Sequence, residues 1–369
     1  MTLTLDRICW DGLFPRATTS PVALNFADLQ AGQTVLITGA GGSIGSALAK
    51  FIHRLQPRCL LLIDSSEQGL YRIHSDLSEA GSRSHVPILG SVTDERCLRD
   101  SFQRWRPDII YHAAAFKHVP LAEMNPFAVV RNNTFGTSTL AAVAQRFEVA
   151  RLIMISTDKA VNPESIMGAS KRLAELVLLG MPACSTRLAS VRLGNVLGSE
   201  GSVVPFFLEQ IARGGPVTVT DPAVERYFLT MDDTVRRVMA CAASCPSDGA
   251  VAIPVMAQPV KIADLARYLI DQASAKDVEI VYTGLRPGDK LREQFVSDGE
   301  SAVGAPIDGV QWIDSPRASE GELAAGLAEL NAALDEMNLS KLLNVLTRLV
   351  PEYEPSAFLL RQVGVPATH

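Results

Sequence analysis

The segment Thr34–Gly45 constrains the fold more than any other part of the chain. Residues 34–38 form a short apolar run that predicts a buried strand, a glycine-rich turn follows, and a helical pattern then begins. This order of elements is typical of a unit that binds the pyrophosphate of a dinucleotide. Glycines let the backbone approach the phosphates, and the N-terminus of the helix offers free N–H groups to the anion.

A second apolar strand, Cys59–Ile63, ends in Asp64, which lies 19 residues after Gly45. An acidic residue at this place suits the hydroxyl groups of the adenosine ribose. No arginine directly follows Asp64, which favours NAD over NADP. Ser65 and Ser66 leave room for a phosphate, so the choice between the two cofactors stays open.

Strand-like and helical patterns continue to alternate up to residue 193, with strands expected at 86–89, 107–112, 151–155 and 186–193. Repeated strand–helix units with short connections predict an α/β fold with a doubly wound parallel sheet. The predicted division is an irregular N-terminal arm (1–30, with Trp10 and Phe14), a nucleotide-binding domain (31–193), a smaller C-terminal substrate-binding lobe interleaved with it (194–317) and a helical tail (318–369).

Polar residues follow the strand 151–155 at the edge of the sheet where ligands bind in such folds. These are Ser156, Thr157, Asp158 and Lys159, and the last two supply a proton acceptor beside a proton donor. Lys171 lies on a predicted helix four residues after Met167, so both side chains lie on one helix face. An isolated Asp–Lys pair is more often a surface ion pair. The upstream glycine-rich motif favours an active site.

Composition excludes several classes of protein. The net charge of −6 argues against nonspecific nucleic-acid binding, which needs a basic surface. The sequence contains no apolar run of about 18 residues, so no membrane span is predicted. The N-terminus does not resemble a secretory signal. The six cysteines are scattered, so we expect buried free thiols, a reducing cytoplasm and no metal site.

The C-terminal half carries Arg192, Arg226, Arg286 and Arg292. Guanidinium groups suit bidentate recognition of phosphate. Each of these arginines alone is more often a surface or ion-pair residue. As a set, one or two of them are expected to hold a diphosphate.

Several motifs together carry a resemblance to a known family. They are Thr38-Gly-x-x-Gly-x-x-Gly45, Phe116-Lys-His-Val-Pro-Leu121, Ser156-Thr-Asp-Lys-Ala-Val-Asn-Pro163, Gly194-Asn-Val-Leu-Gly-Ser199, Gly214-Gly-Pro-Val-Thr-Val-Thr-Asp-Pro222, Arg226-Tyr-Phe228 and Gly284-Leu-Arg-Pro-Gly-Asp-Lys-Leu291. The chain resembles extended short-chain dehydrogenases/reductases with a Rossmann domain. Within them it is similar to the CapD-like nucleotide-sugar 4,6-dehydratases of bacterial polysaccharide biosynthesis.

The resemblance implies an NAD- or NADP-dependent lyase that removes water from a UDP-N-acetylhexosamine, typically UDP-N-acetylglucosamine. Hydride leaves C4 for the nicotinamide, Lys159 removes the C5 proton, Asp158 protonates the departing 6-hydroxyl, and hydride returns to C6. Lys159 must be neutral to act as the base, so its pKa should be lowered by burial or by Lys171 or Lys117. Thr157 is expected to hydrogen-bond the C4 oxygen, and Lys171 to hold the nicotinamide ribose.

The remaining expected contacts fall into two sets. Cofactor contacts are expected at Gly39, Gly41, Gly42, Ser43, Ile44, Gly45, Asp64, Ser65, Ser91, Val92, Ala113, Ala114, Ala115 and Lys171. Substrate contacts are implied at Lys117, Asn195, Ser202, Val203, Arg226 and Arg286. A homo-oligomer is also expected.

One residue departs from the wider superfamily, because Met167 stands where its members usually carry a catalytic tyrosine. A methionine also occurs there in the longer, membrane-anchored members of the branch, whose catalytic half this chain resembles. Asp158, Thr157 or a water must then take the proton of the C4 hydroxyl. An NAD(P)-dependent sugar epimerase and a noncatalytic nucleotide-binding protein remain as alternatives. The exact sugar and the configuration at C5 of the product stay open.

Overall fold

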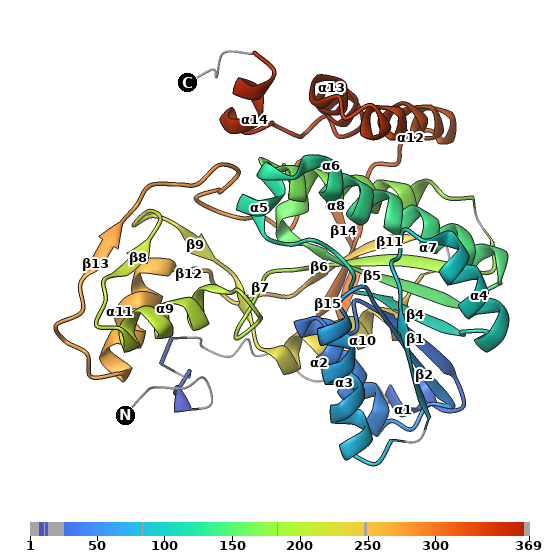
Figure 1. The fold of residues 1–369 in the computed structure, drawn as a ribbon, viewed down its shortest axis with the longest axis horizontal. Coiled ribbons are helices and arrows are strands. Elements are labelled where there is room, and N and C mark those ends of the chain that lie inside the picture. The colour runs from blue at the N-terminus through green and yellow to red at the C-terminus, as the bar shows by residue number, and fades with distance from the viewer. Residues whose placement is uncertain are drawn as a thin grey trace.

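The computed structural model describes residues 7–10, 12–13, 26–82, 84–182, 184–246 and 249–364. A large twisted sheet lies between two layers of helices, a smaller lobe lies beside it, and C-terminal helices form an additional layer (Figure 1). Phe14 falls outside the described residues. Residues Phe26–Gln30 form a short helix, α1, within the segment expected to be irregular.

The central sheet has the predicted doubly wound arrangement. In spatial order its nine strands in the described chain are β14 (Ser301–Ile307), β15 (Val310–Asp314), β11 (Ala250–Pro254), β6 (Arg187–Leu193), β5 (Arg151–Thr157), β4 (Ile109–His112), β1 (Thr34–Thr38), β2 (Cys59–Asp64) and β3 (His85–Leu89). The strands from β11 to β3 are parallel, which confirms the predicted fold class. The strand order reverses between β1 and β4, and ligands bind at such a reversal.

The pair β14 and β15 adds an antiparallel edge that the sequence did not reveal. Every residue of β14 is exposed, so its sequence lacks the alternation of apolar and polar residues by which an edge strand is recognised.

Two layers of helices bury the faces of the sheet (Figure 1). One face packs against α1, α2 (Ser43–Arg54), α3 (Glu67–Glu79) and α10 (Met231–Ser244). The other face packs against α4 (Glu95–Trp105), α7 (Gly136–Arg146) and α8 (Ile166–Gly180), and α5 (Val119–Met124) lies beside α8.

The helical segment between β4 and β5 is interrupted. It consists of α6 (Pro126–Val130), a π-helical turn η2 (Arg131–Phe135) and α7. Such turns are frequent at functional sites. Here the turn lets the Asn133 amide accept from Phe116 N–H at 2.8 Å and donate to the Phe116 carbonyl at 3.0 Å. It therefore fixes the chain that follows β4.

The smaller lobe has its own apolar cluster, in which Val204, Phe207, Leu265 and Leu269 are buried. Its elements are the strand pairs β7 (Asn195–Val196) with β10 (Phe228–Leu229), β8 (Val217–Val219) with β13 (Ile280–Tyr282) and β9 (Glu225–Arg226) with β12 (Val260–Lys261), together with α9 (Val203–Ala212) and α11 (Ile262–Gln272). Ile8 from the N-terminal arm is buried in the same cluster, and Trp10 packs against it.

The C-terminal helices pack on the outer side of α8 (Figure 1). They are α12 (Glu320–Asp335), α13 (Leu339–Leu349) and α14 (Ala357–Gln362). Leu330, Leu342 and Leu346 are fully buried against this side. Because α8 lies between these helices and the sheet, nearly all of its residues are buried.

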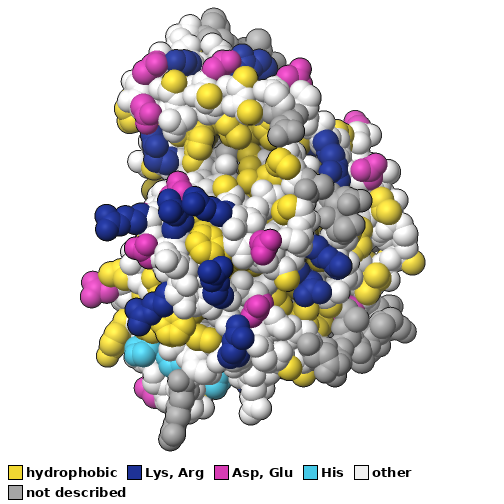
Figure 2. Space-filling model, turned by 90° about the vertical axis from the view of Figure 1, so that its right-hand side faces the viewer, with side chains coloured by type: hydrophobic (Ala, Val, Ile, Leu, Met, Phe, Trp, Pro, Cys, Tyr) yellow, Lys and Arg dark blue, Asp and Glu magenta, His cyan; other side chains and the backbone are white. Residues whose placement is uncertain are grey.

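Figure 2 shows one side of the molecule, where basic and acidic side chains are interspersed with apolar ones. Among the described residues, no helix is both long and apolar enough to cross a membrane. The six thiols are free, but only Cys241 and Cys245 are fully buried. Because Cys9 and Cys184 are exposed, the expectation of buried thiols is wrong for these two.

Candidate active site

A groove of about 300 Å³ opens at the carboxyl ends of β1, β2 and β4. Ten of the residues expected to contact a cofactor line it, namely Gly39, Gly41, Gly42, Asp64, Ser65, Ser91, Val92, Ala113, Ala114 and Ala115. Gln68, Gly69, Arg72, Asn132 and Glu200 also line it and were not anticipated. Ser43, Ile44 and Gly45 lie in the first turn of α2, next to the groove.

Backbone packing explains the glycines of this groove. Gly39 has a φ of +67°, and a Cβ there would lie 2.6 Å from the Ala114 nitrogen. A Cβ on Gly45 would lie 2.0 Å from the Gly39 carbonyl oxygen, and one on Gly41 would lie 2.4 Å from the backbone of Gly69. Side chains are therefore excluded, and the turn can stay close to a bound pyrophosphate.

The carboxylate of Asp64 is held at the mouth of the groove by two backbone amides. Its Oδ2 accepts from Gly41 N–H and its Oδ1 accepts from Ser66 N–H, both at 2.8 Å. This fixed carboxylate, together with the glycine turn, fits the ribose and pyrophosphate of a dinucleotide.

Asp158 and Lys159 form the centre of a second polar cluster, on the turn η3 (Asp158–Ala160) that follows β5. Lys159 Nζ donates to Asp158 Oδ1 at 2.9 Å and to Asn195 Oδ1 at 3.2 Å. Thr157 Oγ1 donates to the same Asp158 oxygen at 2.9 Å. The other oxygen, Asp158 Oδ2, is buried and has no hydrogen-bond partner among the described residues.

The charge of Lys159 differs from the sequence-based expectation. Burial lowers the pKa of its amine, but the carboxylates of Asp158 and Glu293 outweigh burial and raise the pKa above its ordinary value. The predicted lowering of this pKa is therefore wrong for the protein without ligands. Arg226 is the cation that lowers the pKa of Lys159, and not Lys171 or Lys117 as expected.

Helix α8 carries Lys171 and Met167, and both side chains are buried. Burial lowers the pKa of Lys171 to about 8, although Glu175 partly offsets the effect. A Cβ on Gly168 would lie 2.2 Å from the Lys159 carbonyl oxygen, so the helix packs directly on the turn η3. The structure thus packs the helix that bears Met167 and Lys171 on the turn that bears Asp158 and Lys159.

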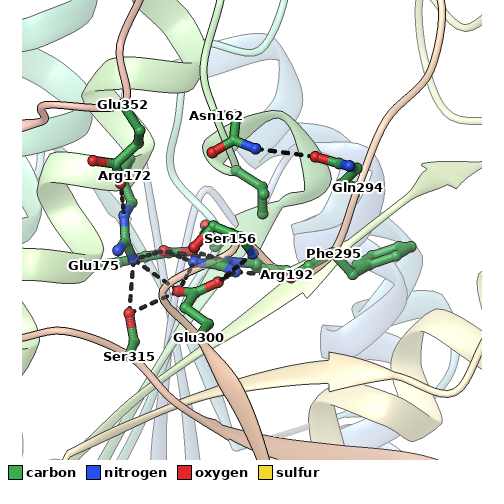
Figure 3. A network of polar contacts seen from close by, with 12 residues as sticks. Ser156, Asn162, Arg172, Glu175, Arg192, Gln294, Phe295, Glu300, Ser315 and Glu352 are labelled. Carbon is green, nitrogen blue, oxygen red and sulfur yellow. Dashed lines mark hydrogen bonds and ion pairs between the residues drawn. The ribbon is translucent and has the colours of Figure 1, made fainter.

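A buried ionic network begins at Ser156, two residues before Asp158 (Figure 3). Ser156 Oγ donates to Glu175 Oε1 at 2.6 Å, and Arg192 joins Glu175 to Glu300 with N–O distances of 2.7 Å. The Arg192 side chain is only 1% exposed. Of the four candidate arginines, Arg192 is therefore an ion-pair residue and not a diphosphate ligand, because its guanidinium is buried and bound to two carboxylates.

The other candidate arginines have different surroundings. Arg226 is buried, and its guanidinium donates to the carbonyl oxygens of Lys290 at 2.7 Å and Leu291 at 3.2 Å. It therefore braces the segment around residue 290. Arg286 and Arg292 are exposed, and each pairs with a carboxylate, of Asp289 and Glu225 respectively.

A loop from the smaller lobe reaches the groove. Glu200 N–H donates to Ser43 Oγ at 2.9 Å, and Lys117 Nζ donates to the Glu200 carbonyl at 2.7 Å. Ser202 ends this loop as the N-cap of α9, and Val203 begins the helix. Ser202 Oγ is buried and has no hydrogen-bond partner within the described part of the chain. Such an atom is suited to meet a ligand.

Glu293 is the main residue of the cluster that sequence reasoning missed. Its buried carboxylate has Oε1 at 3.7 Å from Lys159 Nζ. The only signal in the sequence was its position a few residues after the Arg286–Leu291 motif. A single acidic residue in an irregular segment does not reveal that it is buried.

Comparisons with known proteins agree with this geometry. A family profile described as polysaccharide biosynthesis protein matches residues 35–313. The capsular polysaccharide biosynthesis protein CapD of Staphylococcus aureus is 43% identical over 289 residues, which are 76% of this chain and 48% of CapD. The chain thus spans about half the length of this relative, and the same holds for a probable polysaccharide biosynthesis protein, EpsC, of Bacillus subtilis.

Two further relatives carry names of enzymes. An inverting UDP-N-acetylglucosamine 4,6-dehydratase of Campylobacter jejuni is 31% identical, and a UDP-glucose 4-epimerase of Rickettsia canadensis is 32% identical. Each alignment covers 73% of this chain and 79% of the relative. Among solved structures, Pen from Bacillus thuringiensis superposes with a TM-score of 0.72 at 27% identity, over 79% of this chain and 91% of that one.

Proposed function

The chain belongs to the polysaccharide biosynthesis protein family and has the extended short-chain dehydrogenase/reductase fold, and on this premise we propose that it is a nucleotide-sugar 4,6-dehydratase. Its proposed substrate is a UDP-N-acetylhexosamine, with UDP-N-acetylglucosamine first among the candidates. The observation that carries the proposal is the hydrogen-bonded pair of Asp158 and Lys159 next to the helix of Lys171. Elimination of water needs one acid and one base on neighbouring carbons.

The groove at β1, β2 and β4 would hold the dinucleotide, with Gly39, Gly41 and Gly42 at the pyrophosphate and Asp64 at the adenosine ribose. When bound there, NAD(P) would supply the hydride transfer, from C4 and back to C6. We propose NAD as the cofactor, because the fixed Asp64 carboxylate disfavours a phosphate on the same ribose. Arg72 also lines the groove and favours NADP, and Ser65 and Ser66 beside it leave room for a phosphate.

The pair then performs the elimination. Lys159 first passes a proton across the 2.9 Å hydrogen bond to Asp158 Oδ1, which leaves an amine beside a carboxylic acid. The amine takes the C5 proton, which the C4 ketone has acidified, and the acid gives its proton to the departing 6-hydroxyl. The pair is then again an ammonium and a carboxylate, so no proton is gained from solvent over the elimination.

The side chains around this pair orient it. Thr157 Oγ1 and Asn195 Oδ1 hold the two reacting groups, and Thr157 is the proposed partner of the C4 oxygen. Lys171 is the proposed ligand of the nicotinamide ribose. Met167 has no ionisable group, so Asp158, Thr157 or water takes the C4 hydroxyl proton. Lys117, Ser202, Val203 and Arg286 are the proposed substrate contacts, together with the bracing Arg226.

A nucleotide-sugar 4-epimerase is the second candidate, because the Rickettsia relative carries that name. Epimerisation at C4 needs no acid or base at C5 and C6, so the Asp158–Lys159 pair favours dehydration.

Incubation of the purified protein with UDP-N-acetylglucosamine and NAD, followed by mass spectrometry, separates the two reactions. Dehydration predicts a product lighter by one water, without net reduction of NAD. A new stereoisomer of unchanged mass would support the epimerase instead. If neither product forms from UDP-N-acetylglucosamine or from UDP-N-acetylgalactosamine, the proposed reaction is wrong.

A further inference from the structure

Glu293 is a buried carboxylate that none of the steps above uses. Its side chain is 2% exposed. Oε1 lies 3.7 Å from Lys159 Nζ and 3.8 Å from Arg226 Nε, and Oε2 lies 3.7 Å from Lys290 Nζ. No described residue forms a hydrogen bond with Oε2. A buried ionisable group that is surrounded by charge and has one oxygen without a hydrogen bond needs an explanation.

Two carboxylates therefore face the single amine of Lys159. Asp158 Oδ1 accepts its proton at 2.9 Å, whereas Glu293 stands farther away and acts through its charge. Burial raises the pKa of Glu293, and so does the neighbouring carboxylate of Asp158, against the opposing effect of Lys159. Glu293 thus takes up a proton more readily than an exposed glutamate does.

We propose that Glu293 is a positioning residue that controls the charge of Lys159. As a carboxylate it holds Lys159 as an ammonium. Once protonated, it allows Lys159 Nζ to give a proton to Asp158 Oδ1. That transfer breaks one N–H bond, forms one O–H bond and leaves the net charge of the pair unchanged. The inference rests on the proposed function, in which Lys159 must become an amine before it can act on C5.

The other groups around Lys159 make the role of Glu293 specific. Arg226 on β9 is positive and opposes the ammonium, and Asn195 on β7 is neutral. Lys290 is positive and lies beside Glu293. Besides Asp158, Glu293 is therefore the one described carboxylate that stabilises the charged form of Lys159. Its protonation removes half of the negative charge facing the amine.

The test measures the reactivity of Lys159 in the free protein, so it needs no sugar substrate. Trace labelling with acetic anhydride at several pH values, followed by mass spectrometry of the Lys159 peptide, reports the fraction of neutral amine. Glu293→Gln keeps the shape of the side chain and removes its charge. We expect Lys159 to be labelled about three- to tenfold faster in this variant at a given pH, because a facing charge is lost.

The matched control is Glu164→Gln, which removes an exposed carboxylate that acts on Lys290 and not on Lys159. It should leave the labelling of Lys159 unchanged. Glu293→Asp keeps the charge but moves it away from Nζ, so a smaller increase is expected. This variant carries the test if Glu293→Gln does not fold, as monitored by thermal denaturation.

Equal labelling of Lys159 in wild type and in a folded Glu293 variant would overturn the proposal, and so would an equal increase in the Glu164 control. Neither result depends on which sugar is dehydrated. A protein that shows the expected labelling but leaves UDP-N-acetylglucosamine unchanged would contradict the proposed substrate and support the role of Glu293.

Discussion

Ser156 Oγ donates a 2.6 Å hydrogen bond to Glu175 Oε1, which fastens the end of β5 to the middle of α8. The strand leads into Asp158 and Lys159, and the helix carries Lys171 one turn before Glu175. The same carboxylate binds Arg192 at 2.7 Å and Arg172 at 3.1 Å (Figure 3). One buried glutamate therefore sets the relative position of the turn that bears Asp158 and Lys159 and the helix that bears Lys171.

Replacing Glu175 should lower the stability of the folded protein. Glu175→Gln leaves two buried guanidinium groups short of a negative charge, so the free energy of unfolding should fall by about 3–5 kcal/mol. Denaturant titration measures it. The control is Asp264→Asn, which breaks an exposed pair with Arg267 and should change stability by less than about 1 kcal/mol. Similar losses in both variants would contradict the structural role of Glu175.

The stability of the protein should depend on pH through Lys171. Burial lowers the pKa of its amine to about 8 in the folded protein, against an ordinary value of 10.5. Between these values the unfolded chain binds more protons than the folded one, so stability due to this group rises with pH. Lys171→Met should remove that rise, whereas Lys341→Met, at a helix surface, should keep it. Denaturation curves of the wild type and both variants, measured at several pH values between about 8 and 10.5, test this prediction.

Alanine substitutions at two helical glycines should have opposite effects, because one glycine is closely packed and the other is not. A Cβ on Gly45 would lie 2.0 Å from the Gly39 carbonyl oxygen, so Gly45→Ala must displace the glycine turn. We expect the dissociation constant for NAD to rise at least about tenfold. A Cβ on Gly321 in α12 meets no atom within 4 Å, and Gly321→Ala should stabilise the protein by up to about 1 kcal/mol. Calorimetric titration with NAD that gives equal affinities for both variants would refute the packing argument.

Asp64 should determine the affinity for NAD. Its carboxylate is already oriented by two backbone amides, so ribose hydroxyls would meet a fixed acceptor. Asp64→Ala should weaken NAD binding by about ten- to a hundredfold, the equivalent of one strong charged hydrogen bond, and should reduce the preference for NAD over NADP. Asp100→Ala, on the surface of α4, is the matched control. Fluorescence titration with both cofactors measures the effects.

Lys159 should be needed for chemistry and not for cofactor binding, because it does not line the groove. Lys159→Met should lower kcat by about 10²–10⁴-fold, the usual contribution of a general acid or base, and leave the affinity for NAD unchanged. The exposed Lys261→Met is the control and should retain full turnover. If Lys159→Met kept wild-type kcat, Lys159 would have no part in the mechanism.

The parts of the structure that were predictable are those governed by local patterns. The glycine turn, Asp64 and the strand that precedes Ser156 follow from spacing and from apolar runs, and they lead to the correct sheet. Met167 and Lys171 were placed on one helix for the same reason. Each of these patterns lies within a single strand or helix, so it can be recognised without knowledge of the rest of the fold.

What could not be predicted depends on contacts between distant segments. Arg192 was one of four arginines considered as phosphate ligands, yet Glu300, 108 residues away in the chain, holds it in a buried ion pair. Glu293 lies in the irregular segment between β13 and β14, far from Lys159 in the chain, and approaches it only in the folded protein. The pKa of Lys159 was misjudged for that reason, since one of the two carboxylates that raise it comes from a distant segment.

The helices after residue 319 lie outside the stretch that matches the family profile, which ends at residue 313. They nevertheless shield the apolar flank of α8, where Leu173 and Leu176 meet Leu330 and Leu346. A protein shortened to end at residue 313 would therefore expose the apolar side of α8, the helix that bears Lys171. The family match therefore ends before the helices that complete the apolar packing around α8.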